Sequence, residues 1–232
     1  MGVRERPEAK RSANGRAYDP DRLFLPPDDD LAPNRPGETL RARLDASRRG
    51  RLSLALARLL GRRPVEDSWR RSLAAEMRVG AQLEGLTPGG WEVVHSIVLP
   101  GDAVIPHLLI GPGGVFCVQT EPVPAARVEV GEDEVRVGRE RQPRPCVRRA
   151  RRGAQRCAPV LSRCCGYPVP VRAVLVLSGA AETRVAPALR DVRVLREDEV
   201  AAGLGGLGGV LRPDRVDRIH TVARNRRVWF AA

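Results

Sequence analysis

The chain has 232 residues, of which 40 are cationic and 28 anionic, so its formal net charge is +12. Lys10 is the one lysine, and the basic excess is therefore arginine, whose planar fork of donors suits phosphate. No apolar run reaches the roughly 20 residues of a membrane-spanning helix. The composition predicts no transmembrane segment and favours a polyanionic partner, with nucleic acid (DNA or RNA) preferred over an anionic membrane surface.

The five cysteines form no CxxC pair and no spacing with histidine that suits zinc. No cofactor is expected on this basis. The odd number of cysteines and the lack of a recognisable signal peptide favour a cytoplasmic protein with buried, reduced thiols.

Three segments are expected. Residues 1–37 lack periodic apolar content and predict a disordered tail. Residues 38–69 form an arginine-rich extension, in which leucines at helical spacing predict a basic amphipathic helix over 38–63. Four roles are open for that helix: it binds nucleic acid, a membrane surface or a protein partner, or it packs on the main domain. Residues 70–232 form the main domain.

The main domain opens with a helix that begins after Asp67 and Ser68. Leu73, Met77, Gly80 and Glu84 follow at helical spacing, which places Glu84 on the apolar stripe. A carboxylate facing a core is costly unless it is paired or binds a metal. Glu84 is therefore a candidate functional residue.

Strand patterns alternate with further helical patterns after this helix. Strands are predicted at 91–99, 104–110, 115–121, 169–177 and 192–195, with a short hairpin formed by 127–130 and 135–137. Helices are predicted at 146–164, with a kink or break at Pro159, and at 213–226. This mixture indicates an α/β (α+β) domain, in which helices flank a mixed sheet.

Several of these residues resemble the nuclease-related domain (NERD) family, which has a restriction-endonuclease-like core of the PD-(D/E)xK type. Gly80-Ala-Gln-Leu-Glu84 is similar to the family's helix motif, and Ile105-Pro106-His107 stands where the family usually has Ile-Asp-His. The run from Gly111 to Val118 is similar to the turn and strand that lead into the Glu/Asp-x-Lys motif. Gln119-Thr120-Glu121 occupies that motif itself. The resemblance spans roughly residues 74–225.

The resemblance implies a degenerate active site. Phosphodiester cleavage in such folds uses carboxylates to hold divalent cations, and Mg²⁺ requires hard oxygen ligands. Pro106 offers no ligand, Gln119 offers a neutral amide, and Glu121 reverses the charge of the family's lysine. Glu84 and His107 remain. Glu84 is expected close to Gln119 and Glu121, where Glu84 and Glu121 are weak candidate metal ligands. His107 is expected to be a partly buried histidine, with its hydrogen bonds satisfied, beside the former active-site pocket.

The most basic segment is 139–163, with nine arginines and one glutamate. On its helix the residues off the apolar stripe are candidates for phosphate contact: Arg148, Arg149, Arg151, Arg152 and Arg156. The alternative is a solvated face in an arginine-biased chain. We expect a non-catalytic domain that binds nucleic acid. The alternatives are a weak Mg²⁺-dependent nuclease with a rearranged site, and a protein that docks a partner or a membrane surface through residues 38–63.

Overall fold

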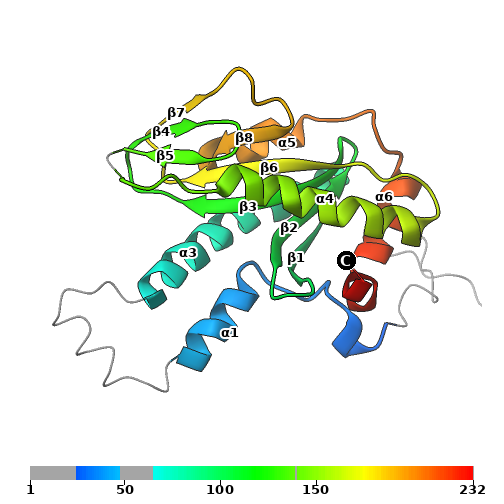
Figure 1. The fold of residues 1–232 in the computed structure, drawn as a ribbon. Helices are drawn as coiled ribbons and strands as arrows, with labels where there is room; N and C mark the ends of the chain where they lie inside the picture. Colours follow the sequence, from blue (N-terminus) through cyan, green and yellow to red (C-terminus); the bar gives the residue numbers. More distant parts are fainter. Residues whose placement is uncertain (1–24, 48–64, 139, 232) are drawn as a thin grey trace, which may run out of the picture.

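The computed structural model describes residues 25–47, 65–138 and 140–231. Its centre is a five-stranded mixed sheet in the order β1-β2-β3-β6-β8 (Figure 1). Its strands are β1 (Glu92–Val98), β2 (Val104–Gly111), β3 (Gly114–Pro122), β6 (Val171–Ser178) and β8 (Val192–Arg196). The first three form an antiparallel meander, and β6 runs parallel to both of its neighbours. The continuous apolar run of β6 follows from this position, because a central parallel strand is buried on both faces.

A smaller sheet has the order β5-β4-β7, with β4 (Arg127–Val130), β5 (Val135–Val137) and β7 (Glu182–Val185). The hairpin of β4 and β5 matches the sequence prediction. Its four valines alternate inward and join the main core: Val128, Val130, Val135 and Val137. Strand β7 was not predicted, because its side chains are largely exposed and lack an alternating pattern.

Helices cover both faces of the large sheet. On one face lie α3 (Val65–Glu84) and α5 (Val200–Gly205), which pack on Phe116 and Val118 of β3. On the other lie α4 (Cys146–Cys165) and α6 (Pro213–Ala223), which pack on Val115 and Cys117 of the same strand. Short 3-10 turns complete the chain: η2 (Pro27–Asp29), η4 (Thr87–Gly89), η5 (Glu197–Glu199) and η6 (Arg226–Ala231). The mixed sheet flanked by helices confirms the expected fold class.

The buried face of α3 differs from the predicted stripe. Its buried residues are Ala75, Glu76, Val79, Gly80 and Leu83, whereas Met77 is 43% exposed. The predicted stripe was displaced by one residue, and one residue is about 100° of helix rotation. The carboxylate that faces the core is therefore Glu76, and the prediction that Glu84 occupies the apolar stripe is wrong.

Helix α4 continues through Pro159, so the predicted break does not occur. Pro159 is exposed, so its ring lies on the solvent side of the helix. Water can satisfy the carbonyl that loses its N–H partner there. The apolar face of the helix is continuous beneath it.

Residues 25–37 are folded against the domain, so the prediction of disorder over 1–37 is wrong for this part. Leu31 is only 3% exposed and packs in the main core, and Asp30 forms an ion pair with Arg224. Asn34 Nδ2 donates to the carbonyl oxygen of His95 at 3.2 Å. Helix α1 (Glu38–Ser47) follows and confirms the start of the predicted basic helix. Residues 1–24 and the remainder of that helix, 48–63, lie outside the described residues.

Replacing Leu31 with Ala tests whether this N-terminal segment stabilises the domain. We expect the free energy of unfolding to fall by about 2–4 kcal/mol, because a buried leucine side chain is removed from a packed core. Urea denaturation measures the change. Val98→Ala is the control, since Val98 is 46% exposed. A Leu31 variant as stable as this control would show that the segment does not contribute.

Candidate nucleic-acid interface

The two faces of β3 carry different polar groups. Cys117 faces α4 closely enough that a Cβ on Gly153 would lie 2.8 Å from its Sγ. Because side chains alternate along a strand, Gln119 and Glu121 share this face. Thr120 is directed to the α3 side with Phe116 and Val118. Gln119 and Glu121 therefore face α4.

Glu121 is held by two arginines. Its carboxylate accepts hydrogen bonds from Arg144 at 3.1 Å and Arg149 at 2.9 Å, and its side chain is only 11% exposed. Arg144 also pairs with Glu140 and donates to the carbonyl oxygen of Pro122. These contacts, led by the bond to Glu140, raise the pKa of Arg144. The charge of Glu121 is thus compensated by the two guanidinium groups.

Glu84 does not join this group. It lies on the α3 side of the sheet, where its Oε1 is 3.2 Å from His95 Nε2, and its side chain is 53% exposed. The expectation that Glu84 lies close to Gln119 and Glu121 is therefore wrong, because the sheet separates them. It follows that the two candidate metal ligands, Glu84 and Glu121, are not brought to one site.

His107 is fully buried, whereas partial burial was predicted, and it pairs with a second histidine across the β1–β2 ladder. The Nδ1 atoms of His95 and His107 are 2.8 Å apart, so one must donate and the other accept. Burial lowers the pKa of His95 to about 4, and burial together with His95 lowers that of His107. Both rings are neutral near pH 7, and the contact of His95 with Glu84 is not an ion pair.

The outer nitrogens of the two rings make no hydrogen bond within the described part of the chain. His95 Nε2 lies 3.2 Å from Glu84 Oε1 without the geometry of a hydrogen bond. His107 Nε2 likewise has no hydrogen-bond partner among the described residues. Thr120 Oγ1 and Glu76 Oε2 on the same side of the sheet are also buried without a partner there. Burial raises the pKa of Glu76 to about 7.

Pro106 coincides with an interruption of the sheet. The β1–β2 ladder pairs His95 with His107 and Ile97 with Ile105 but omits the residues between them. Ser96 has a φ of 54° at this position, and proline supplies no ladder hydrogen bond. Pro106 is buried in the strand, and its side chain carries no oxygen that could bind a metal.

A cleft of about 470 Å³ lies beside Gln119, between α4 and the end of the β1–β2 hairpin. Its floor includes the apolar residues Leu99, Ala103, Ile105 and Cys117, with Gln119 among them, and its wall comes from α4: Arg149, Arg152, Gln155 and Arg156. We call this the arginine cleft. In the described part of the chain its lining has three arginines and no carboxylate.

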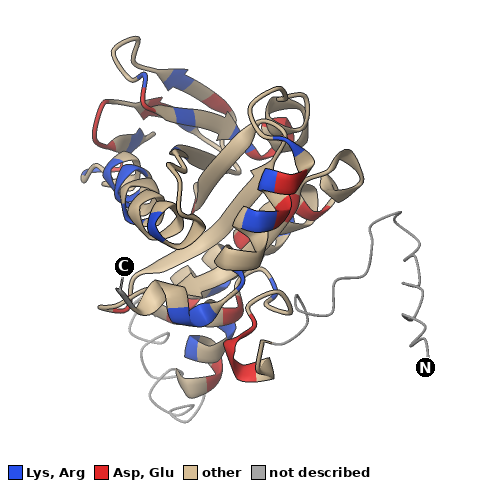
Figure 2. Cartoon of the chain, turned by 90° about the vertical axis from the view of Figure 1, so that its right-hand side faces the viewer, with Lys and Arg blue, Asp and Glu red and all other residues tan. Residues whose placement is uncertain are grey.

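The five candidate arginines of α4 have different surroundings. Arg149 pairs with Glu121, and Arg151 pairs with Asp133 at 2.8 Å and Asp191 at 2.5 Å. Arg151 therefore ties α4 to the small sheet and to the start of β8. For Arg148, Arg152 and Arg156, which are exposed, the described structure records no ion pair. Basic residues repeat along α4, which contains no acidic residue (Figure 2).

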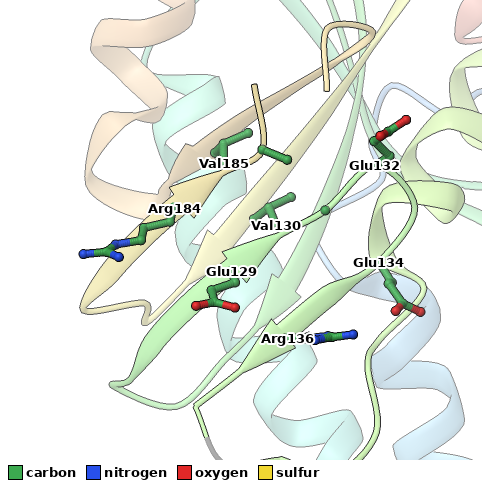
Figure 3. Close-up of a pocket in the computed structure, with 9 residues that line it drawn as sticks. Glu129, Val130, Glu132, Glu134, Arg136, Arg184 and Val185 are labelled. Carbon is green, nitrogen blue, oxygen red and sulfur yellow. The ribbon is translucent and has the colours of Figure 1, made fainter. Parts of the chain in front are cut away.

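Two other hollows differ in their charge. One of about 720 Å³ lies at the end of β3 and is lined by Arg71, Arg144, Arg149, Glu121 and Glu140 among others; we call it the strand-end cleft. It adjoins the arginine cleft through Arg149, which lines both. The hollow on the small sheet, of about 480 Å³, mixes three glutamates with Arg136 and Arg184 (Figure 3). The arginine cleft is thus the one of these three best suited to phosphate.

Residues 71–178 match the family model of NERD, the nuclease-related domain. Over this segment the chain is similar to the nuclease-related domain family. No curated protein and no solved structure gave a significant match. The matched segment runs from within α3 through β6, so it includes the arginine cleft, the paired histidines and the whole of α4.

Two further findings concern the described residues. They contain no cluster of three histidine, cysteine, aspartate or glutamate side chains arranged to hold a metal ion. Their helices include none with the length and apolar character needed to cross a bilayer.

Sequence reasoning missed three residues of these sites. Glu76 was hidden by the displaced stripe, although its neighbours at helical spacing, Val79 and Leu83, gave a usable signal. His95 required the register of β1 with β2. Arg144, in the Pro143-Arg144-Pro145 loop, carried no signal that it would reach back to β3.

The stability of the domain should depend on Glu76 and on pH. Its pKa in the folded protein, about 7, is above the ordinary value of 4.5, so its stabilising contribution is present below pH 4.5 and is lost as pH rises through 7. That shift corresponds to about 3 kcal/mol. We expect Glu76→Gln to be more stable than the unmodified protein by up to that amount at pH 8.5, and the difference to vanish near pH 4.5. Unfolding in urea across this range measures it.

Glu84→Gln is the matched control, because Glu84 lies on the same helix and is exposed. Its stability difference from the unmodified protein should change little over the same pH range. An equal pH dependence in both variants would show that burial of Glu76 is not the cause.

Proposed function

We propose that the nuclease-related domain of this chain binds the phosphate backbone of nucleic acid through the arginine cleft and does not cleave it. The observation that carries this proposal is the pairing of Glu121 with Arg144 and Arg149, next to a cleft walled by arginine. Positive charge surrounds the position where a nuclease of this type would gather carboxylates.

The proposed loss of cleavage rests on the ligands available. A hydrolytic Mg²⁺ site needs carboxylate oxygens that are free to coordinate. Gln119 supplies a neutral oxygen, Pro106 supplies none, and both oxygens of Glu121 accept from guanidinium groups. A metal at Glu121 would have to displace these arginines. Mg²⁺ is therefore expected as a cofactor only under the alternative function, a weak nuclease with a rearranged site.

The proposed binding rests on charge that remains available. Arg152 and Arg156 line the cleft, are exposed and have no recorded ion pair within the described residues. Each phosphate that such a residue neutralises releases condensed counterions, which gives affinity that falls steeply with salt. Backbone contacts carry no direct base information, so the nucleic acid is expected to be bound with little sequence preference.

Replacing Arg152 and Arg156 together with Ala tests this interface. We expect weaker binding to unrelated sequences by a similar factor, and a slope of log affinity against log salt that is shallower by about 2, one for each lost contact. Fluorescence anisotropy in a salt series measures both. The control is Arg190→Ala with Arg193→Ala, two exposed arginines in and before β8 that remove the same charge away from the cleft.

If the cleft variant and the control change affinity and slope equally, only net charge matters and the proposed interface is wrong. A third variant, Arg151→Ala, should affect stability more than binding, because Arg151 is occupied by Asp133 and Asp191. Exposed pairs of this kind contribute about 0–1 kcal/mol each.

The purified protein should not cleave plasmid DNA or RNA when Mg²⁺ or Mn²⁺ is added. Gel electrophoresis after prolonged incubation measures this, with a known nuclease as positive control. Glu121→Ala should lower stability, since Arg144 and Arg149 lose their shared partner, without altering the absence of cleavage. Cleavage by the unmodified protein that Glu121→Ala or Glu84→Ala abolishes would favour the rearranged nuclease instead.

A further inference from the structure

We propose that the arginine cleft takes one nucleotide unit of a single-stranded nucleic acid, with the base against the apolar floor and the adjoining phosphate on the arginine wall. This rests on the proposed function and adds a substrate class to it. The juxtaposition of an apolar floor and a basic wall in one cleft leads to this inference.

The floor is unlike a surface that binds phosphate alone. Leu99, Ala103, Ile105 and Cys117 give it an apolar character, and phosphate gains nothing from apolar side chains. The cleft volume of about 470 Å³ lies within the range of roughly 300–1,000 Å³ that is usual for small-ligand sites. A nucleotide combines a base, which suits the apolar floor, with a phosphate, which suits the arginine wall.

Two amide side chains at the cleft suit the edge of a base. Gln119 lies on the floor and Gln155 on the wall, and each carries both a donor and an acceptor. The recorded hydrogen bond of Gln119, from Nε2 to the carbonyl oxygen of Thr120, is long at 3.4 Å. Gln119 can exchange it for a base at little cost.

A single strand fits this arrangement better than a duplex. In a duplex the bases are stacked and paired, and a base reaches a cleft only by flipping, which costs a few kcal/mol. Unpaired bases are already free to leave the stack. Arg149 also lines the strand-end cleft, whose lining mixes Arg71 with ion-paired residues, and we place the next phosphate of the strand beside Arg71.

The test compares three labelled probes with the full chain at fixed salt, namely a single strand, its duplex and the same single strand with abasic sites, and uses the mononucleotide AMP as an unlabelled competitor. We expect the single strand to bind about tenfold more tightly than the duplex and the abasic strand, a difference of about 1.4 kcal/mol. AMP should compete weakly, because it lacks the neighbouring phosphate.

Two variants connect this preference to the floor. Ala103→Leu fills the cleft, and Gln119→Leu removes the amide; each should reduce the preference for the single strand over the abasic strand and leave the salt slope unchanged. Ala181→Leu, at an exposed turn, is the matched control. Circular dichroism and thermal unfolding verify that each variant is folded.

The outcomes separate the two proposals. If the single, duplex and abasic probes bind equally and depend on Arg152 and Arg156, the base-accepting cleft is wrong and the phosphate-binding function stands. If AMP binds as tightly as the strand, the ligand is a free nucleotide and the single-strand proposal is overturned. If no probe binds at low salt, both proposals fail.

Discussion

Strand β3 lies at the centre of the sheet, and the alternation of its side chains decides which polar groups of this protein meet. Gln119 and Glu121 face α4 with Cys117, while Thr120 faces α3 with Val118. A side chain cannot reach through a sheet, so no rearrangement of rotamers brings Glu84 to Glu121. Glu84 on α3 and the positions of β3 that resemble a nuclease motif therefore lie on opposite faces of the sheet.

The buried carboxylate of Glu121 affects more than its own position. A buried carboxylate without a partner would cost several kcal/mol, and Arg144 and Arg149 remove that cost by bonding to both oxygens. The same contacts attach the beginning of α4 and the Pro143–Pro145 loop to the end of β3. Arg149 is thereby fixed between the two clefts, and its position links the arginine wall of one to the polar lining of the other. The pairing of Glu121 with Arg144 and Arg149, which leaves neither carboxylate oxygen free for a metal, thus also shapes a basic surface.

Much of the fold could be predicted from the sequence, because its signals are local. The apolar run of β6, the glycine turn between β2 and β3 and the valines of the β4–β5 hairpin each specify their own element. The face of the sheet on which each polar side chain lies was harder to predict from the sequence. The predicted stripe of α3 was wrong by one residue, which exchanged Glu76 for Glu84, and the grouping of Glu84 with Glu121 failed because the family motif gives no information about faces. The partners of Arg151 and Glu121 are distant in sequence, and only the assembled sheet brings them together.

Packing alone explains part of the likeness to a nuclease helix motif. A Cβ at Gly80 would lie 2.3 Å from Pro36 Cγ and 3.5 Å from His107 Cε1, so any larger residue would displace the N-terminal segment from α3. That segment is also held at the interruption opposite Pro106, where the Glu38 amide donates to Ser96 Oγ and Asn34 donates to the carbonyl of His95. Gly80 and His107 therefore have structural reasons to be present that require no metal and no hydrolysis. A functional role for this domain is consequently sought on the other face of the sheet, where Gln119 lies beside the arginines of α4.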